Sequence, residues 1–127
     1  MNTNRTSSSK RFSMDLLSKK CQPCEGIGES YKKNKAVEML AKVPGWQLNS
    51  DAKQISREYA MKNFMAAVNF MQKIADVAEA ENHHPDLHLT GYRKLRVDLS
   101  THALGGLSEN DFILAAKINE LPADLKK

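Results

Sequence analysis

The chain has 127 residues, of which 41% are hydrophobic and 27% charged, a composition typical of a single globular domain with one modest core. No apolar run approaches the ~18 residues that a transmembrane helix requires, so the sequence predicts no membrane span and no membrane partner. The formal net charge of +4 lies entirely in residues 1–20, and the neutral remainder argues against direct nucleic-acid binding, which needs a basic surface.

Residues 1–20 are rich in Ser, Thr and Asn and poor in acidic residues. The segment lacks the apolar region of a secretory signal, and its composition is typical of a disordered tail. The same composition also suits an organellar transit peptide. We therefore expect residues 1–20 to be a disordered basic tail on a cytoplasmic protein, with an organellar destination as the alternative.

A CxxC motif, Cys21-Gln-Pro-Cys24, holds both cysteines and lies in an expected N-terminal extension over residues 21–33. Two thiolates supply half of a tetrahedral zinc site, and no second CxxC or CxxH completes it. A thioredoxin-like redox pair needs a helix directly after it, whereas Gly26 and Gly28 follow here. We expect a structural or subunit-bridging role for the two cysteines, or none.

Residues 30–43 contain apolar positions spaced like one face of a helix, which ends at Pro44-Gly45 because proline cannot continue the hydrogen-bond ladder. Two segments with strand character, 46–48 and 54–61, then flank a polar turn and predict a β-hairpin. The helix positions expected to face the core are Val37, Leu40 and Val43.

The strongest helical pattern covers residues 62–81, where one broad apolar face recurs at i, i+3/i+4 and i+7. Its methionines and phenylalanines are typical of core packing. The helix is expected to end near His83 and His84, because Pro85 disfavours helical geometry in the residue before it. The expected inward positions are Phe64, Ala67, Val68, Met71, Ile74, Ala75 and Ala78.

Residues 95–103 alternate Leu95, Val97 and Leu99 with polar side chains, which predicts a half-buried strand. The same alternation places His102 on the polar side, unless the strand ends before it. A glycine pair then marks a loop before the final helix.

That final helix is expected to start at Ser108, with Asp111 three residues later in a capping-box arrangement. The order helix, hairpin, helix, strands, helix predicts an α+β domain over residues 34–121. The expected architecture is a four-stranded antiparallel sheet with helices packed on one face.

Three of the four histidines lie within residues 81–88, and four interpretations are open for them. They are a metal site, acid–base catalysis, a ligand pocket without chemistry, and an accident of a polar turn. Their spacing matches neither an HExxH helix nor a zinc finger, so no metal is expected. Two or three imidazoles at a helix–strand junction could instead move protons near neutral pH.

A longer pattern links these histidines to residues on both sides of them. Five elements at fixed spacing together resemble the signature of the pterin-4a-carbinolamine dehydratases. The resemblance covers about residues 34–120 and includes Pro-Gly-Trp at 44–46. The five elements are Glu79, His83-His84-Pro85, Tyr92, His102 and Asp111, separated by three, six, nine and eight residues.

The resemblance implies loss of water from 4a-hydroxytetrahydropterin to give quinonoid dihydropterin, with no cofactor and no metal. It implies that His83, His84 and His102 are catalytic, one of the first two as the acid at the 4a-hydroxyl and His102 as an assisting acid or base. The substrate-binding candidates that it implies are Asn82, Pro85, Ser100, Thr101, Trp46, Asp111 and Glu79.

Some of these positions also have a purely structural interpretation. Asp111 is explained by the capping box alone, Glu79 looks like an exposed helix glutamate, and His88 lies outside the signature as a surface residue. Leu87 and Asn82 depart from residues common in the family, an aromatic and an aspartate, which affects the shape of the pocket and the tuning of the histidines.

The resemblance also implies partners. The family's usual assembly is a homotetramer, a dimer of dimers, and some members act as dimerisation cofactors of a homeodomain transcription factor. An aromatic amino acid hydroxylase is the expected metabolic partner. A non-catalytic role as a dimerisation cofactor or assembly partner therefore remains the alternative to the enzyme.

Overall fold

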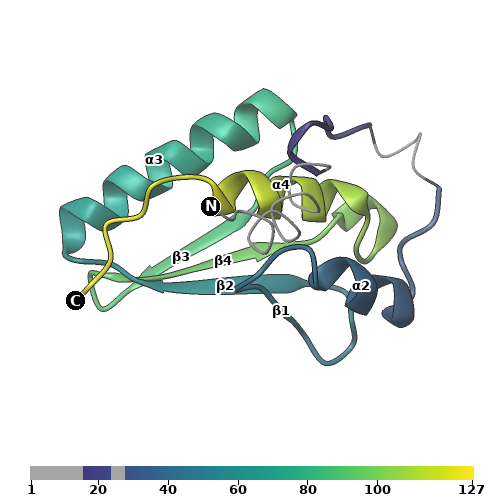
Figure 1. Cartoon of the computed structure of the whole chain (residues 1–127), viewed down its shortest axis with the longest axis horizontal. Helices are drawn as coiled ribbons and strands as arrows, with labels where there is room; N and C mark the ends of the chain where they lie inside the picture. Colours follow the sequence, from purple (N-terminus) through teal and green to yellow (C-terminus); the bar gives the residue numbers. More distant parts are fainter. Residues whose placement is uncertain (1–15, 24–27) are drawn as a thin grey trace, which may run out of the picture.

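A computed structural model describes residues 16–23 and 28–127 (Figure 1). A four-stranded antiparallel sheet with the order β1-β2-β4-β3 forms one layer, and α3 and α4 lie over one of its faces. The predicted α+β fold with this sheet is confirmed. The elements in chain order are α2 (Lys33–Leu40), β1 (Gln47–Leu48), β2 (Ile55–Ala60), α3 (Phe64–Glu81), β3 (Asp86–Thr90), β4 (Lys94–Leu99), a 3-10 helix (His102–Leu104) and α4 (Glu109–Asn119).

The central strand β4 follows the predicted alternation, because Leu95, Val97 and Leu99 are all buried on the helix side of the sheet. Its partner β2 places Ile55 opposite Leu99 and thereby continues the same apolar layer. The predicted hairpin is also present, since β1 pairs antiparallel with β2. Polar residues of β2, β3 and β4 fall on the opposite, outer face, which the helices leave uncovered.

Asn63 is the N-cap of helix α3. Its side-chain oxygen accepts from the Ala66 N–H and satisfies one donor that the helix start leaves unpaired. Its buried stripe differs from the expected one at the start. Phe64, expected inward, is 50% exposed, whereas Phe70 is buried. Helical side chains tilt towards the N-terminus, so a side chain in the first turn projects past the helix end rather than onto the sheet. The buried stripe consists of Ala67, Phe70, Ile74, Ala78 and Glu81.

Helix α2 also differs in orientation from the prediction. Val37, expected in the core, is 50% exposed, while Ala36 and Met39 are buried. Ala36, Met39 and Val43 have the i, i+3, i+7 spacing of a helix face, and the predicted set has the similar spacing i, i+3, i+6. Because neighbouring residues point about 100° apart on a helix, only one of these two stripes can face the sheet.

The N-terminal part of the described chain packs against the domain. Leu16 is 2% exposed and belongs to the core, although it lies within the segment expected to be a disordered tail. Residues 16–20 thus differ from that expectation, because burying Leu16 removes its apolar surface from water. Residues 1–15, and Cys24 of the CxxC motif, lie outside the described residues. Among the described helices, none has the length and apolar character needed to cross a membrane.

Candidate active site

His83 and Asp111 form a buried pair between the end of α3 and the start of α4. Asn82 caps α3 in a left-handed conformation (φ 54°), and the His83 N–H then donates to the Ala78 carbonyl. This turn directs the chain out of the helix towards β3. Nε2 of His83 lies 2.7 Å from Oδ1 of Asp111, and the two side chains are 10% and 0% exposed.

The second carboxylate oxygen of Asp111 accepts two further hydrogen bonds. They come from the Ser108 N–H at 3.0 Å and from the Thr101 hydroxyl at 2.8 Å. The first belongs to the predicted capping box of α4, so Asp111 caps the helix and holds a histidine at once. An ionised carboxylate only accepts hydrogen bonds, so the hydrogen bond between the two side chains uses a proton on Nε2 of His83.

His102 begins the short 3-10 helix directly after Thr101. Strand β4 has already ended at Leu99, so the strand alternation does not extend to His102, and its side chain is exposed. Gly105 closes the turn in a left-handed conformation (φ 68°) and donates its N–H to the His102 carbonyl. Because Thr101 is bound to Asp111, the loop that carries His102 is tethered to the carboxylate that holds His83.

His84 points to a different partner. Its Nε2 lies 2.6 Å from Oε2 of Glu79 in the last turn of α3, and the two side chains are 53% and 77% exposed. An exposed pair of this kind contributes little to stability. The His84 side chain is more than half exposed, so it stays accessible to a ligand although it contacts Glu79. Glu79 is thus an exposed helix glutamate, and it also contacts a signature histidine.

The remaining predicted binding residues fall into two groups. Asn82 and Pro85 flank the histidine pair in sequence, and Ser100 precedes Thr101, which binds the same Asp111 as His83. Trp46 is buried, and its indole N–H donates to Oδ1 of Asn119 at 2.8 Å. Asn119 ends α4, roughly 12 Å along the helix axis from Asp111 at its start. Trp46 is thus anchored at the other end of α4, and its contact with substrate stays a prediction.

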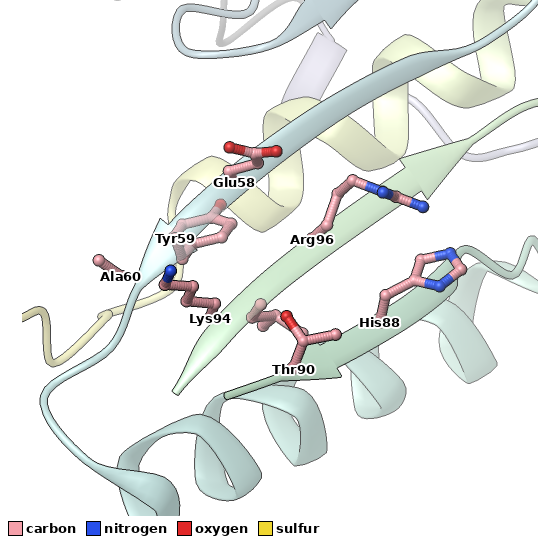
Figure 2. A pocket seen from close by; sticks show the side chains of 8 residues that line it. Glu58, Tyr59, Ala60, His88, Thr90, Lys94 and Arg96 are labelled. Carbon is pink, nitrogen blue, oxygen red and sulfur yellow. The ribbon is translucent and has the colours of Figure 1, made fainter. Parts of the chain in front are cut away.

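A cavity of about 510 Å³ lies elsewhere, on the outer face of the sheet (Figure 2). His88 borders it, and its Nε2 lies 3.0 Å from Oδ2 of Asp98. Asp98 also accepts from Arg96 and from the Ser56 hydroxyl. His88 is a surface residue at 43% exposure, as predicted. The three signature histidines, His83, His84 and His102, do not line this cavity. The volume of a cavity is therefore not what identifies the candidate site.

Glu81 is a buried residue that the sequence interpretation overlooked. It ends α3 and accepts from the Lys117 ammonium at 2.6 Å and from the Cys21 N–H at 2.8 Å. Burial opposes its ionisation, but these hydrogen bonds and the charges of Lys117 and Lys20 outweigh burial, so the pKa of Glu81 is lowered. The sequence contained a signal for its burial, because Glu81 lies three residues after Ala78 and so continues the buried stripe of α3.

Within residues 16–23 and 28–127, no three His, Cys, Asp or Glu side chains group in a way that could hold a metal ion. The candidate site offers a carboxylate-held imidazole at His83, an exposed imidazole next to it in sequence at His84, and a third on a tethered loop at His102. Such a set can donate and accept protons near neutral pH without large tuning.

Comparison with known proteins adds independent findings. Residues 29–121 match the family model described as pterin 4 alpha carbinolamine dehydratase. The chain is 46% identical over 113 residues to the mitochondrial pterin-4-alpha-carbinolamine dehydratase 2 of Arabidopsis thaliana, covering 87% of this chain and 60% of that relative. It is 46% identical over 110 residues to a relative from Halorhodospira halophila named for the same dehydratase, covering 87% of this chain and all of that one.

A solved structure is also similar. The crystal structure of a transcriptional coactivator/pterin dehydratase from Brucella melitensis matches with a TM-score of 0.66 and 32% sequence identity. The match covers 72% of this chain and 96% of that chain.

Proposed function

The chain belongs to the pterin 4 alpha carbinolamine dehydratase family, whose relatives are named as hydro-lyases, and on this premise we propose that it removes water from 4a-hydroxytetrahydropterin. The product is quinonoid dihydropterin, and the role is recycling of the pterin after an aromatic amino acid hydroxylase has used it. The observation that carries the proposal is the buried His83–Asp111 pair, which holds one signature imidazole against a carboxylate.

The reaction needs one proton added and one removed at neighbouring atoms. The C4a–O bond breaks as the hydroxyl accepts a proton and leaves as water. The N5–H proton is lost, and its electron pair forms the new C=N bond, so the proton count is unchanged. One of His83 and His84 acts as the acid at the hydroxyl, and His102 assists as acid or base.

Alanine substitution of each histidine tests this mechanism against freshly generated 4a-hydroxytetrahydropterin. The wild-type protein is expected to accelerate dehydration over the spontaneous reaction. Loss of one general acid or base is expected to lower the rate by about 10²–10⁴-fold. Wild-type rates in His83→Ala, His84→Ala and His102→Ala would contradict the proposal. His88→Ala is the matched control, since His88 lies on the outer face of the sheet.

The alternative function is non-catalytic, as a dimerisation cofactor or assembly partner. Two apolar side chains at the start of α3 favour an interaction surface, since Phe64 and Met65 are 50% and 59% exposed. We assign this surface first to a second copy of the chain, within a dimer of dimers. Light scattering after size exclusion measures the assembly, and Met65→Asp is expected to reduce its mass. A wild-type monomer at micromolar concentration would count against this surface.

Two observations bear on the location of the protein in the cell. The Arabidopsis relative is named mitochondrial, and residues 1–20 of this chain are basic and poor in acids. Cytoplasm is the first expectation and an organelle the alternative. Fusion of residues 1–20 to a fluorescent protein decides between them, because a transit peptide carries the fusion into the organelle.

A further inference from the structure

Residues 21 and 22, just before the domain, form hydrogen bonds with the end of α3 and the start of α4. His83 lies two residues after the end of α3, and Asp111 lies in the first turn of α4. The Cys21 N–H donates to Oε1 of Glu81 at 2.8 Å. The Gln22 N–H donates to Oδ1 of Asn110 at 2.9 Å, and the Asn110 amide donates back to the Gln22 carbonyl at 2.7 Å. We call this group of residues the N-terminal brace; it consists of Cys21, Gln22, Glu81 and Asn110.

Further contacts hold the chain around the start of α4. The Tyr31 N–H donates to the Leu107 carbonyl at 2.7 Å, and the Tyr31 ring stacks on Phe112 with the centroids 6.1 Å apart. Lys19 pairs with Glu109 at 2.6 Å on the surface. Residues on both sides of Asp111 therefore contact the segment that precedes the domain.

Two of the four brace residues, Glu81 and Asn110, lie very close in sequence to the His83–Asp111 pair. Glu81 precedes His83 by two residues, and Asn110 immediately precedes Asp111. Both are buried, at 7% and 3% exposure. Glu81 also accepts from Lys117 of α4, so one carboxylate joins the N-terminal segment, the end of α3 and α4. These contacts fix the two backbone stretches from which the paired side chains project.

We propose that Glu81 and Asn110 are positioning residues for the His83–Asp111 pair, and that residues 21–22 act through them as part of the working site. The proposal rests on the proposed function for its catalytic consequence. The brace residues act through the backbone, because the contacts of Asp111 itself are with His83, Ser108 and Thr101. A shift of about 1 Å in a catalytic group can lower a rate about 100-fold, so loss of this support has a measurable effect.

The test replaces Glu81 in the full-length chain in two ways. Glu81→Leu removes the acceptors for Cys21 and Lys117, which donate to different carboxylate oxygens, whereas Glu81→Gln keeps one acceptor oxygen and replaces the other with an NH2 donor. Asp76→Asn is the matched control, since Asp76 is an exposed carboxylate on the same helix that binds Gln72. Each variant is assayed for kcat and KM, and the imidazole N–H of His83 is followed by proton and ¹⁵N NMR.

We expect Glu81→Leu to lower kcat about 10–100-fold with KM little changed, and to shift or broaden the His83 N–H signal. Glu81→Gln, which keeps one of the two acceptors, is expected to give values of both properties between those of the wild type and those of Glu81→Leu. A folded Glu81→Leu with the wild-type kcat and an unmoved His83 signal would overturn the proposal. So would lost stability alone, without change in either readout.

A second variant keeps the test decisive if Glu81→Leu does not fold. Asn110→Ala removes both hydrogen bonds to Gln22 and leaves the Glu81 contacts in place, and it is expected to shift the same His83 signal. An unmoved signal in folded Asn110→Ala overturns the positioning role of Asn110. Failure of the proposed function can be distinguished from failure of the positioning role. A wild-type protein without dehydratase activity would still give the His83 N–H signal in NMR, and the variants would still be compared by that signal.

Discussion

Two histidine–aspartate pairs occur among the described residues, one on each side of the sheet, and they differ in what else the carboxylate binds. On the helix side, Asp111 accepts from His83 at 2.7 Å and otherwise from the neutral donors Thr101 and Ser108. On the outer face, His88 lies 3.0 Å from Asp98, which also binds Arg96 through both carboxylate oxygens.

Because of this difference, we expect a chemical role for the first pair and a structural role for the second. A guanidinium is always charged, so Arg96 neutralises Asp98 whatever the state of His88. His88 is also 43% exposed, and water screens its interaction with the carboxylate. At the buried pair, the other donors to Asp111 are the neutral groups of Thr101 and Ser108, and the two paired side chains are almost fully buried. Under the proposed function, we expect the same two residue types to support proton transfer at the buried pair and only surface pairing at the outer one.

The largest expected effect comes from exchanging the two histidines for glutamine in separate proteins. His83→Gln is expected to lower the dehydration rate by about 10²–10⁴-fold, because glutamine keeps a hydrogen bond to Asp111 but cannot transfer a proton. His88→Gln should keep the wild-type rate. Steady-state assays of both proteins measure the ratio, and equal losses in the two would remove the distinction drawn between the pairs.

The next effect is on stability. Asp111→Ala is expected to reduce the free energy of unfolding by about 3–5 kcal/mol, because it strips a buried histidine, a hydroxyl and a helix cap of their shared acceptor. Asp98→Ala should cost about 1–2 kcal/mol, since Arg96 and His88 are partly exposed and regain water. Urea denaturation followed by circular dichroism gives both values. An Asp98 cost that matched or exceeded the Asp111 cost would contradict this ranking.

The smallest expected effect concerns acid stability around the buried pair. The pKa of Glu81 is lowered from 4.5, so its contribution is fully present above the unfolded-state pKa and is lost as pH falls through the folded-state pKa. Glu81→Gln removes the titrating group. The stability advantage of the wild type over this variant should therefore shrink between about pH 6 and about pH 3 in urea titrations. An advantage that stays constant over this range would show that Glu81 does not titrate differently in the folded protein.

Much of the fold follows from local patterns in the sequence. The alternation in residues 95–99 gave β4 its buried side, and the long apolar pattern located α3 to within two residues of its start. The orientation of the short helix was not predictable in this way. Val37 and Ala36 each belong to an apolar stripe with helical spacing, and only packing against the sheet decides which of them is buried.

The candidate site was predictable to the extent that it lies in a motif. The signature spacing identified His83 and Asp111, and the capping box located Asp111 at the start of a helix. The brace was not predictable, because its hydrogen bonds join residues 60 and 88 positions apart. Nor does the motif explain Trp46, which the structure ties to Asn119 at the far end of α4.

The hydrogen bond between His83 and Asp111 also has a consequence for folding. It joins residues 28 positions apart, and strands β3 and β4 lie within the loop that it closes. Closing a loop of this length costs about 3 kcal/mol in chain entropy before a constant term, more than a single hydrogen bond returns. The pair therefore forms only when sheet and helices have already docked. In a refolding experiment, the His83 N–H signal would serve as a reporter of the completed native state, appearing with the last cooperative step rather than with early helix formation.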